Sequence, residues 1–229
     1  MNGYGRILAI AIGLAASGLG GCQTSVTAGH GPPTLSKLST GDAGRTRDLY
    51  LSVIDQLIQS GKSHAAMAHL DEFEIAYGVV PQSLKLRADA WLALDNPGEA
   101  KKGYDAIVTG PLSGFGYHGL GRVAAVGGDW QKALEYFEIA VVDQPTNTRF
   151  LNDLGCAQFQ TGDFASAEFS LRKALELSPG DPEVRDNIVV LLAKSGETGR
   201  FSEIFPDLTD AAQIESLKAR MAMYAVDDD

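Results

Sequence analysis

Residues 148–181 read TRFLNDLGCAQFQTGDFASAEFSLRKALELSPGD. Apolar side chains recur at helical spacing before Gly162, and the same spacing returns between Phe164 and Ala174. Gly162 interrupts the pattern, and Pro179 ends it because a proline cannot continue a helix. The stretch therefore predicts two amphipathic helices joined by a tight turn.

Small residues occupy fixed places in this predicted hairpin. Leu154-Gly155 lies in the first helix, Ala167 in the second, and Pro179 after it. This order resembles the 34-residue tetratricopeptide (TPR) signature, in which Leu-Gly, Ala and Pro recur at set positions. The resemblance implies that Gly155 and Ala167 lie where the two helices touch, because a larger side chain would push the backbones apart.

The same pattern recurs in register along the chain. Ala133 stands where Ala167 stands one repeat later, and the copy that contains Ala133 matches the signature best. The first copy departs at Ile54, where glycine or alanine is usual, so its hairpin is expected to pack more loosely. The copies cover 47–80, 81–113, 114–147 and 148–181, and 182–195 supplies the first helix of a fifth.

This repetition predicts an all-α fold, a TPR superhelical solenoid of about four helix hairpins with a C-terminal capping helix. No β-strand is expected in the repeats. The expected helices lie near 47–59, 63–76, 82–94, 98–108, 115–126, 130–142, 148–160, 164–176, 183–194 and 210–224.

The region 196–229 is predicted to close the C-terminal end of the array. Gly196-Glu197-Thr198-Gly199 breaks the preceding helix, and residues 201–205 form a short apolar turn. Thr209 to Ala225 then carries a patchy apolar face at helical spacing. Because a repeat array needs a terminal element with a polar outer side, this last helix is expected to be the cap.

Residues 1–21 have the pattern of a secretion signal. Arg6 precedes a short apolar run, and small residues lead to Cys22. Leu19-Gly20-Gly21-Cys22 resembles a bacterial lipoprotein box. The resemblance implies cleavage before Cys22 and lipidation of its sulfur, and Gln23 resembles an outer-membrane address. A plain signal peptide with an incidental cysteine is the alternative.

Residues 22–46 follow this box and are rich in Thr, Ser, Gly and Pro. They lack apolar periodicity, so they are predicted to form a flexible tether behind the lipidated cysteine. Attached in this way, the repeats would stand off the outer membrane and face the periplasm.

The composition bears on which classes of partner the chain can bind. The chain is 45% apolar, which is ample for a core, and its formal charge is −10. An acidic surface disfavours nucleic acid and anionic lipid headgroups. The charge does not identify a partner, since it also serves ordinary solubility.

No constellation of residues predicts an enzyme, a metal site or a cofactor. With Cys22 lipidated, Cys156 is left alone, and it is expected to be a small buried side chain, with a reactive thiol as the alternative. The four histidines are scattered, and no cysteine or carboxylate completes a metal set. Residues 114–119 fit G-x-G-x-x-G, but a dinucleotide site needs a preceding strand, and a helix is predicted there instead.

The TPR resemblance implies a concave groove lined by the first helix of each hairpin. In the middle repeats the groove positions mix aromatic and polar side chains, which suits an extended peptide or a partner helix. A solvated helix face with chance aromatics is the alternative. Replacing Arg122, Asn152 and Phe159 by alanine is expected to leave folding nearly unchanged, because surface substitutions change stability little. A larger cost is expected for Phe159 if its side chain is partly buried. The predicted protein-binding residues are Lys85, Phe115, His118, Arg122, Arg149, Asn152 and Phe159.

The C-terminal motifs narrow the resemblance further. Asp186-Asn187-Ile188-Val189 precedes Gly199-Arg200-Phe201-Ser202-Glu203 and then Phe205-Pro206-Asp207-Leu208. With the lipoprotein box, the linker and the repeats, this order resembles the TadD lipoproteins of tight-adherence (Flp) pilus machines. The resemblance implies an outer-membrane assembly factor that binds the pilus secretin or associated factors without turnover. A generic periplasmic TPR scaffold for another envelope machine, or a substrate-binding accessory module, remains the alternative.

Overall fold

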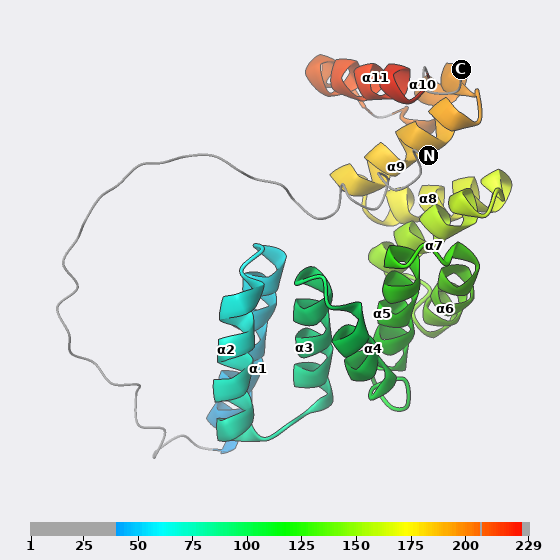
Figure 1. Ribbon diagram of the computed structural model, residues 1–229. Coiled ribbons are helices and arrows are strands. Elements are labelled where there is room, and N and C mark those ends of the chain that lie inside the picture. Colours follow the sequence, from blue (N-terminus) through cyan, green and yellow to red (C-terminus); the bar gives the residue numbers. More distant parts are fainter. Residues whose placement is uncertain (1–39, 207, 226–229) are drawn as a thin grey trace.

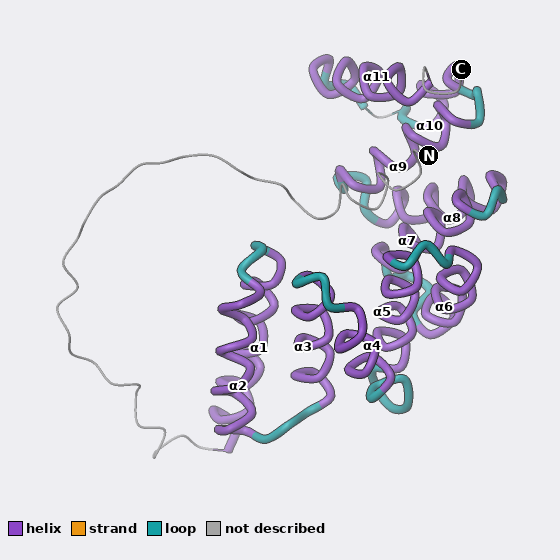
Figure 2. The backbone as a smooth tube through the Cα atoms, viewed as in Figure 1, coloured by secondary structure: helices purple, strands orange, loops and turns teal. Residues whose placement is uncertain are grey.

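The computed structural model describes residues 40–206 and 208–225, and every regular element in these ranges is a helix (Figure 2). The all-α prediction is therefore confirmed. Cys22, the signal sequence and most of the expected tether lie outside the described residues. The elements are α1 (Thr40–Gln59), α2 (Ser63–Tyr77), α3 (Pro81–Ala93), α4 (Pro97–Asp105), α5 (Ser113–Val126), α6 (Trp130–Asp143), α7 (Thr148–Gln160), α8 (Phe164–Leu177), α9 (Pro182–Lys194), the 3-10 helix η3 (Thr198–Arg200), α10 (Phe201–Ile204) and α11 (Ala211–Ala225).

Consecutive helices form hairpins that stack side by side from α1 at one end to α11 at the other (Figure 1). The first helices of neighbouring hairpins contact one another directly, as α1 does α3, α3 does α5 and α7 does α9. Within the described chain, the second helices α2, α4, α6 and α8 make no comparable contact with each other. The first helices therefore lie on the inner side of the curve. We call their exposed side the inner face, and it carries Lys85, Asp89, Phe115, Arg122 and Arg149.

Side-chain caps start several of the helices. The side chains of Asp129, Asn147 and Asp163 each accept a hydrogen bond from the backbone N–H three residues later. Such caps satisfy donors that have no partner inside the helix. At the tight turn before α8, Gly162 has φ +88°, in the left-handed region that favours glycine. Local sequence thus sets where α6, α7 and α8 begin.

The hairpin contact predicted from the small residues is confirmed. A Cβ at Gly155 would lie 2.7 Å from Cγ of Leu171 and 3.3 Å from the carbonyl oxygen of Ala167. Ala167 is fully buried. Ile54, which stands in the first hairpin where Gly155 stands in the fourth, is also fully buried, and α1 and α2 pack less extensively than α7 and α8. The bulky side chain of Ile54 therefore keeps α1 and α2 from approaching as closely as α7 and α8, as expected.

Two helix boundaries differ from the prediction by three residues or more. α1 begins at Thr40, so residues 40–46 belong to the first helix and not to the tether. A helix that is anchored by buried side chains such as Leu51 extends through residues of low propensity, because propagation adds one hydrogen bond per residue. α4 ends at Asp105, three residues early, ahead of a turn in which Gly110 has φ +118°.

The C-terminal region closes the stack. Leu217 and Met221 of α11 are buried in one apolar cluster with Val189 of α9. Phe201 and Ile204, expected in a short apolar turn, form the short helix α10 and join the same cluster. The helix that follows the repeats thus covers apolar side chains of α9, as a cap is expected to do.

Candidate functional site

Polar pairs connect the first helices of successive hairpins. His118 Nε2 of α5 lies 2.7 Å from Asp153 Oδ2 of α7, and Asn187 Nδ2 of α9 donates to Asn152 Oδ1 of α7 at 2.9 Å. Each pair joins residues 35 positions apart. Counted from the first residue of each repeat (114, 148 and 182), position five of one repeat therefore meets position six of the next. Because an ionised carboxylate only accepts, Nε2 of His118 carries the proton in the first pair. We call these contacts the inter-repeat ladder.

Asp89 of α3 is the centre of a second set of contacts. Its carboxylate accepts hydrogen bonds from Lys85 Nζ at 2.8 Å, Tyr104 OH at 2.6 Å and Arg122 Nη1 at 2.9 Å. Burial alone would raise the pKa of Asp89, but the charges of Lys85 and Arg122, with hydrogen bonds from Lys85 and Tyr104, lower it to about 2. Asp89 is therefore ionised at neutral pH and holds both cations at the inner face.

Aromatic rings border this charged group. The His118 ring is stacked on Phe150, with ring centroids 4.4 Å apart, and Phe115 meets Phe150 edge-on at 5.3 Å. Lys85 Nζ lies 5.6 Å from the centre of the Phe115 ring. Burial lowers the pKa of His118, and the nearby Arg122 and Arg149 lower it further, although the hydrogen bond to Asp153 opposes this. His118 is therefore a neutral ring at physiological pH.

These residues surround a cavity of about 50 Å³ on the inner face. Its lining has three cations, Lys85, Arg122 and Arg149, against one carboxylate, Asp89. Arg149 is exposed, and within the described chain it forms no ion pair. A locally positive pocket thus occurs in a chain whose formal charge is −10. The lining consists of Lys85, Asp89, Tyr104, Phe115, His118, Gly119, Arg122, Asn147, Arg149 and Phe150.

The G-x-G-x-x-G stretch serves helix packing. A Cβ at Gly119 would overlap the ring of Tyr104, and one at Gly116 would lie 3.0 Å from the backbone nitrogen of Val108. The stretch lies at the start of α5 and follows α4 and a turn, so the strand that a dinucleotide site requires is not there. The glycines let α5 approach α4 closely, which brings Tyr104 to the inner face.

The structure brings five of the seven predicted groove residues together. Lys85, Phe115, His118, Arg122 and Arg149 all line the cavity. The expectation that the triple replacement of Arg122, Asn152 and Phe159 leaves folding nearly unchanged is nevertheless wrong in part, and His118 is buried as well.

His118 is only 4% exposed and Asn152 only 3%, because both form the inter-repeat ladder. Phe159 lies away from the cavity, half-buried, with its ring 5.5 Å from that of Phe164. Arg122 is held by Asp89. Replacing Arg122, Asn152 and Phe159 together would therefore remove structural contacts as well as any binding contacts.

Tyr104, Phe150 and Asp153 belong to the site but were not predicted. Tyr104 comes from the second helix of its hairpin, and Phe150 and Asp153 are not at the groove positions implied by the TPR pattern. One signal was available for Asp153. The sequence places histidine at 118 and aspartate at 153, a spacing of one repeat plus one residue, which a search for paired polar residues between repeats would find.

The described residues were also searched for a reactive cysteine, a metal site and a membrane-spanning helix. Cys156 is buried, and burial raises the pKa of its thiol well above the usual value, which disfavours the reactive thiolate. Among the described residues no group of three or more His, Cys, Asp or Glu is placed to hold a metal ion. None of the described helices combines the length and apolar character needed to cross a membrane.

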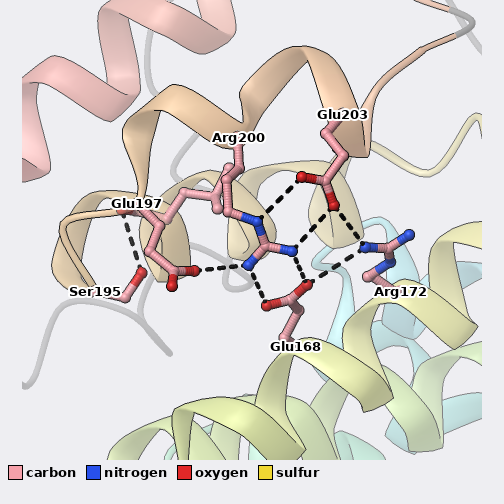
Figure 3. Close-up of polar contacts among 7 residues, drawn as sticks. Glu168, Arg172, Ser195, Glu197, Arg200 and Glu203 are labelled. Carbon is pink, nitrogen blue, oxygen red and sulfur yellow. Dashed lines mark hydrogen bonds and ion pairs between the residues drawn. The ribbon is translucent and has the colours of Figure 1, made fainter.

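A second polar cluster joins the C-terminal region to the last full repeat (Figure 3). Arg200 of η3 donates from Nη1 and Nη2 to the two carboxylate oxygens of Glu168 of α8, at 2.8 and 2.7 Å. Arg200 also donates from Nη1 to Glu197 Oε2 at 2.8 Å and from Nη2 to Glu203 Oε1 at 3.2 Å. Arg172 lies 3.4 Å from Glu168 and completes the cluster. We call this cluster the Arg200 latch.

Comparison with known sequences identifies the repeats. Residues 118–182 match the family model of a tetratricopeptide repeat. The TPR repeat-containing protein PA4299 of Pseudomonas aeruginosa is 31% identical over 214 residues, which cover 92% of this chain and 83% of that protein. The similarity therefore extends well beyond the single matched repeat segment.

Solved structures share the fold. The TPR protein TTC0263 of Thermus thermophilus superposes with a TM-score of 0.62 at 19% identity, over 77% of this chain and 99% of that one. PilF of Pseudomonas aeruginosa gives 0.60 at 19% identity, over 79% and 84%. MamA of Desulfovibrio magneticus gives 0.54 at 18% identity, over 76% and 95%. At these identities the likeness concerns the fold alone.

Proposed function

This chain belongs to the family of TPR repeat-containing proteins, and we propose that it is a binding factor for assembly of the tight-adherence (Flp) pilus machine. TPR proteins act on the whole as protein-interaction scaffolds, so the proposed role needs no turnover and no cofactor. The partner is a protein of that machine, either its secretin or a factor associated with the secretin. The resemblance of the C-terminal motifs to TadD lipoproteins supports this choice of machine.

One observation supports the inner face as the binding surface. The cavity there combines an exposed cation, Arg149, with a half-buried aromatic ring, Phe115, on helices held in register by buried polar pairs. A rigid surface with a few convergent polar and aromatic groups suits recognition of an extended segment. The pairs through Asp89 and His118 hold these groups in place before the partner arrives, which reduces the entropy cost of binding.

Membrane attachment forms the second half of the proposal. A lipid on Cys22 would anchor the protein to the outer membrane with the repeats in the periplasm, where a pilus secretin is reached. Cys22→Ala is expected to leave the chain unprocessed or to release it from the outer-membrane fraction. Unchanged fractionation and unchanged mass after this substitution would contradict the anchor and leave the binding role untouched.

The binding role is tested by site-specific crosslinking in cells. A photo-crosslinking residue in place of Arg149 samples the inner face, and one in place of Glu138, exposed on the second helix α6, samples the outer side. We expect the probe at 149 to capture the secretin or a secretin-associated factor and the probe at 138 to capture neither. Capture of those proteins from 138 alone would place the contact elsewhere. Normal pili in a deletion strain would refute the pilus role.

A further inference from the structure

We propose that a second copy of this chain docks its Phe169 ring into a recess between α3 and α4. The recess has a volume of about 230 Å³, and we call it the outer recess. None of its lining residues lines the cavity on the inner face. The inference therefore goes beyond the proposed function and does not depend on it.

The apolar walls of the outer recess come from the two helices of one hairpin. Leu84, Ala88 and Trp91 line it from α3, and Gly103 and Ala106 line it from α4. A Cβ at Gly103 would lie only 2.8 Å from Cβ of Ala88, so the close approach of these helices requires glycine. Because glycine has no side chain, nothing from α4 fills the space beside Leu84 and Trp91.

The third repeat indicates what fits such a space. Gly103 lies three residues after the buried alanine of α4, as Tyr136 does in α6, and Leu84 is the fourth residue of its repeat, as is Tyr117. The rings of Tyr117 and Tyr136 lie 6.2 Å apart and pack against one apolar cluster. The chain thus supplies an aromatic ring at this position in the third repeat and none in the second.

Phe169 of α8 is a ring suited to the outer recess. It is 72% exposed and makes no contact with another ring of the described chain. Phe164, the other exposed phenylalanine in the described ranges, instead packs on Phe159 at 5.5 Å. In size the recess is adequate, since an engineered apolar cavity of about 150 Å³ binds benzene.

Charge complementarity favours the same contact. Arg87, at the edge of the outer recess, is bound by Asp71 at 2.9 Å and by Glu74 at 2.7 Å, so two carboxylates serve one cation. Lys173 lies one turn after Phe169 and forms no ion pair in the described part of the chain. When the ring enters the recess, this lysine brings a positive charge towards the excess negative charge.

The contact has to join two molecules. α8 lies far from α3 and α4 along the stack (Figure 1), so Phe169 cannot reach the recess of its own chain. The second repeat of one copy would meet the fourth repeat of the next, which is a heterologous contact. Such a contact leaves a recess and a ring available at the two ends, so it continues into a closed ring or an open chain of copies.

The first test maps the contact in the full chain. Photoreactive p-benzoylphenylalanine replaces Phe169, and isotope-labelled and unlabelled chains are mixed, irradiated and digested. Mass spectrometry then identifies peptides that join a labelled chain to an unlabelled one. We expect the probe to attach to residues 84–106 of the other copy. Attachment between copies only outside this range would overturn the proposal.

The second test measures association by sedimentation equilibrium. Phe169→Ser removes the ring, and Ala106→Leu fills the recess from an exposed position, so each should lower the association constant at least about tenfold. Val142→Ser is the matched control, because Val142 is an exposed apolar side chain of α6 outside the contact. It should associate as the unchanged protein does.

Two results would overturn the contact between copies. The first is an unchanged chain that stays monomeric at every concentration, and the second is an equal loss of association in Val142→Ser and Phe169→Ser. p-Cresol, the side-chain analogue of tyrosine, probes the recess alone through the indole NMR signal of Trp91. If p-cresol bound there while the chain stayed monomeric, the recess would serve another partner and the second copy would be excluded.

Discussion

A single glycine allows the inner face to form. Gly119 of α5 lies against the buried ring of Tyr104, whose hydroxyl donates to Asp89. We expect Gly119→Ala to destabilise the protein, since its Cβ would overlap that ring. Overpacking costs about 1–3 kcal/mol, against about 1 kcal/mol gained in helix propensity. Urea unfolding measures the difference.

The matched control is Gly44→Ala in α1, where a Cβ would meet nothing within 4 Å. That substitution gains helix propensity without a clash, so it should stabilise the protein by up to about 1 kcal/mol. If Gly119→Ala and Gly44→Ala changed the free energy of unfolding equally, the close approach of α5 to Tyr104 would contribute nothing to stability.

His118 makes stability depend on pH. Burial lowers its pKa in the folded state, so as pH falls through about 6.5 the unfolded chain binds a proton that the folded chain does not. The stability present above that pH is therefore lost on acidification. We expect the melting temperature to fall between pH 7.5 and 5.5, and to fall less in His118→Gln. If the melting temperatures of the two proteins fell equally with pH, the lowered pKa of His118 would be contradicted.

The charged groups around His118 determine the direction in which its pKa is displaced. Asp153 favours the protonated ring, whereas Arg122, Arg149 and burial oppose it. The pKa values of Asp153 and Asp89 are also lowered, so their contribution to stability is present above about pH 4 and is lost only at more acidic pH. The two pH ranges are therefore separable in a titration of stability.

The Arg200 latch holds η3 and α10 against α8. Arg200→Gln removes the bidentate pair with Glu168 and the contacts with Glu197 and Glu203. We expect faster amide hydrogen exchange in residues 198–206 and in α11, because the short helices then rely mainly on the buried side chains of Phe201, Ile204 and Phe205. Raising the salt concentration to about 1 M should act in the same direction, since it screens exposed charges.

Lys101→Gln is the control for the latch. It breaks an exposed ion pair with Asp105 on α4 and should leave exchange at the C-terminal end unchanged. Unchanged exchange in Arg200→Gln would mean that apolar contacts alone fix these helices. The hydrogen bonds from Arg200 also lower the pKa values of Glu168 and Glu203, so acid should weaken the latch only below about pH 4.5.

For the whole molecule, stability depends on each repeat being covered by its neighbour, and α11 covers the last one. Leu217 is 7% exposed and packs in the cluster that includes Val189 and Leu192 of α9. Leu217→Ala should cost about 2–5 kcal/mol through lost burial and a residual cavity. It should also promote association, because apolar side chains of α9 become accessible. Urea unfolding and size-exclusion chromatography measure the two effects.

Ala219→Ser is the matched control on the exposed side of the same helix. It should change stability by no more than about 0.5 kcal/mol and leave the elution volume unaltered. A similarly small effect of Leu217→Ala would show that α11 does not act as a cap.

The helices, their order and their register could be predicted from the amino-acid sequence. Apolar spacing, turn glycines and helix caps are local signals, so ten predicted helices match observed ones within a few residues at most boundaries. The exception at Thr40 arose because a tertiary anchor extended α1 through residues of low helix propensity. Small residues such as Gly155 also disclosed the hairpin contacts, because close helix approach restricts which residues fit there.

The contacts of the groove residues could not be predicted, because they depend on how the hairpins stack. The repeat pattern assigned His118 and Asn152 to the inner face, but it did not reveal that partners from the next repeat bury both of them. Nor did it show that Arg122 is bound by Asp89, whereas Arg149 stays exposed at the rim of the cavity. Periodicity fixes the direction of a side chain from its own helix, but burial and charge pairing depend on residues of neighbouring repeats that come together only when the hairpins stack.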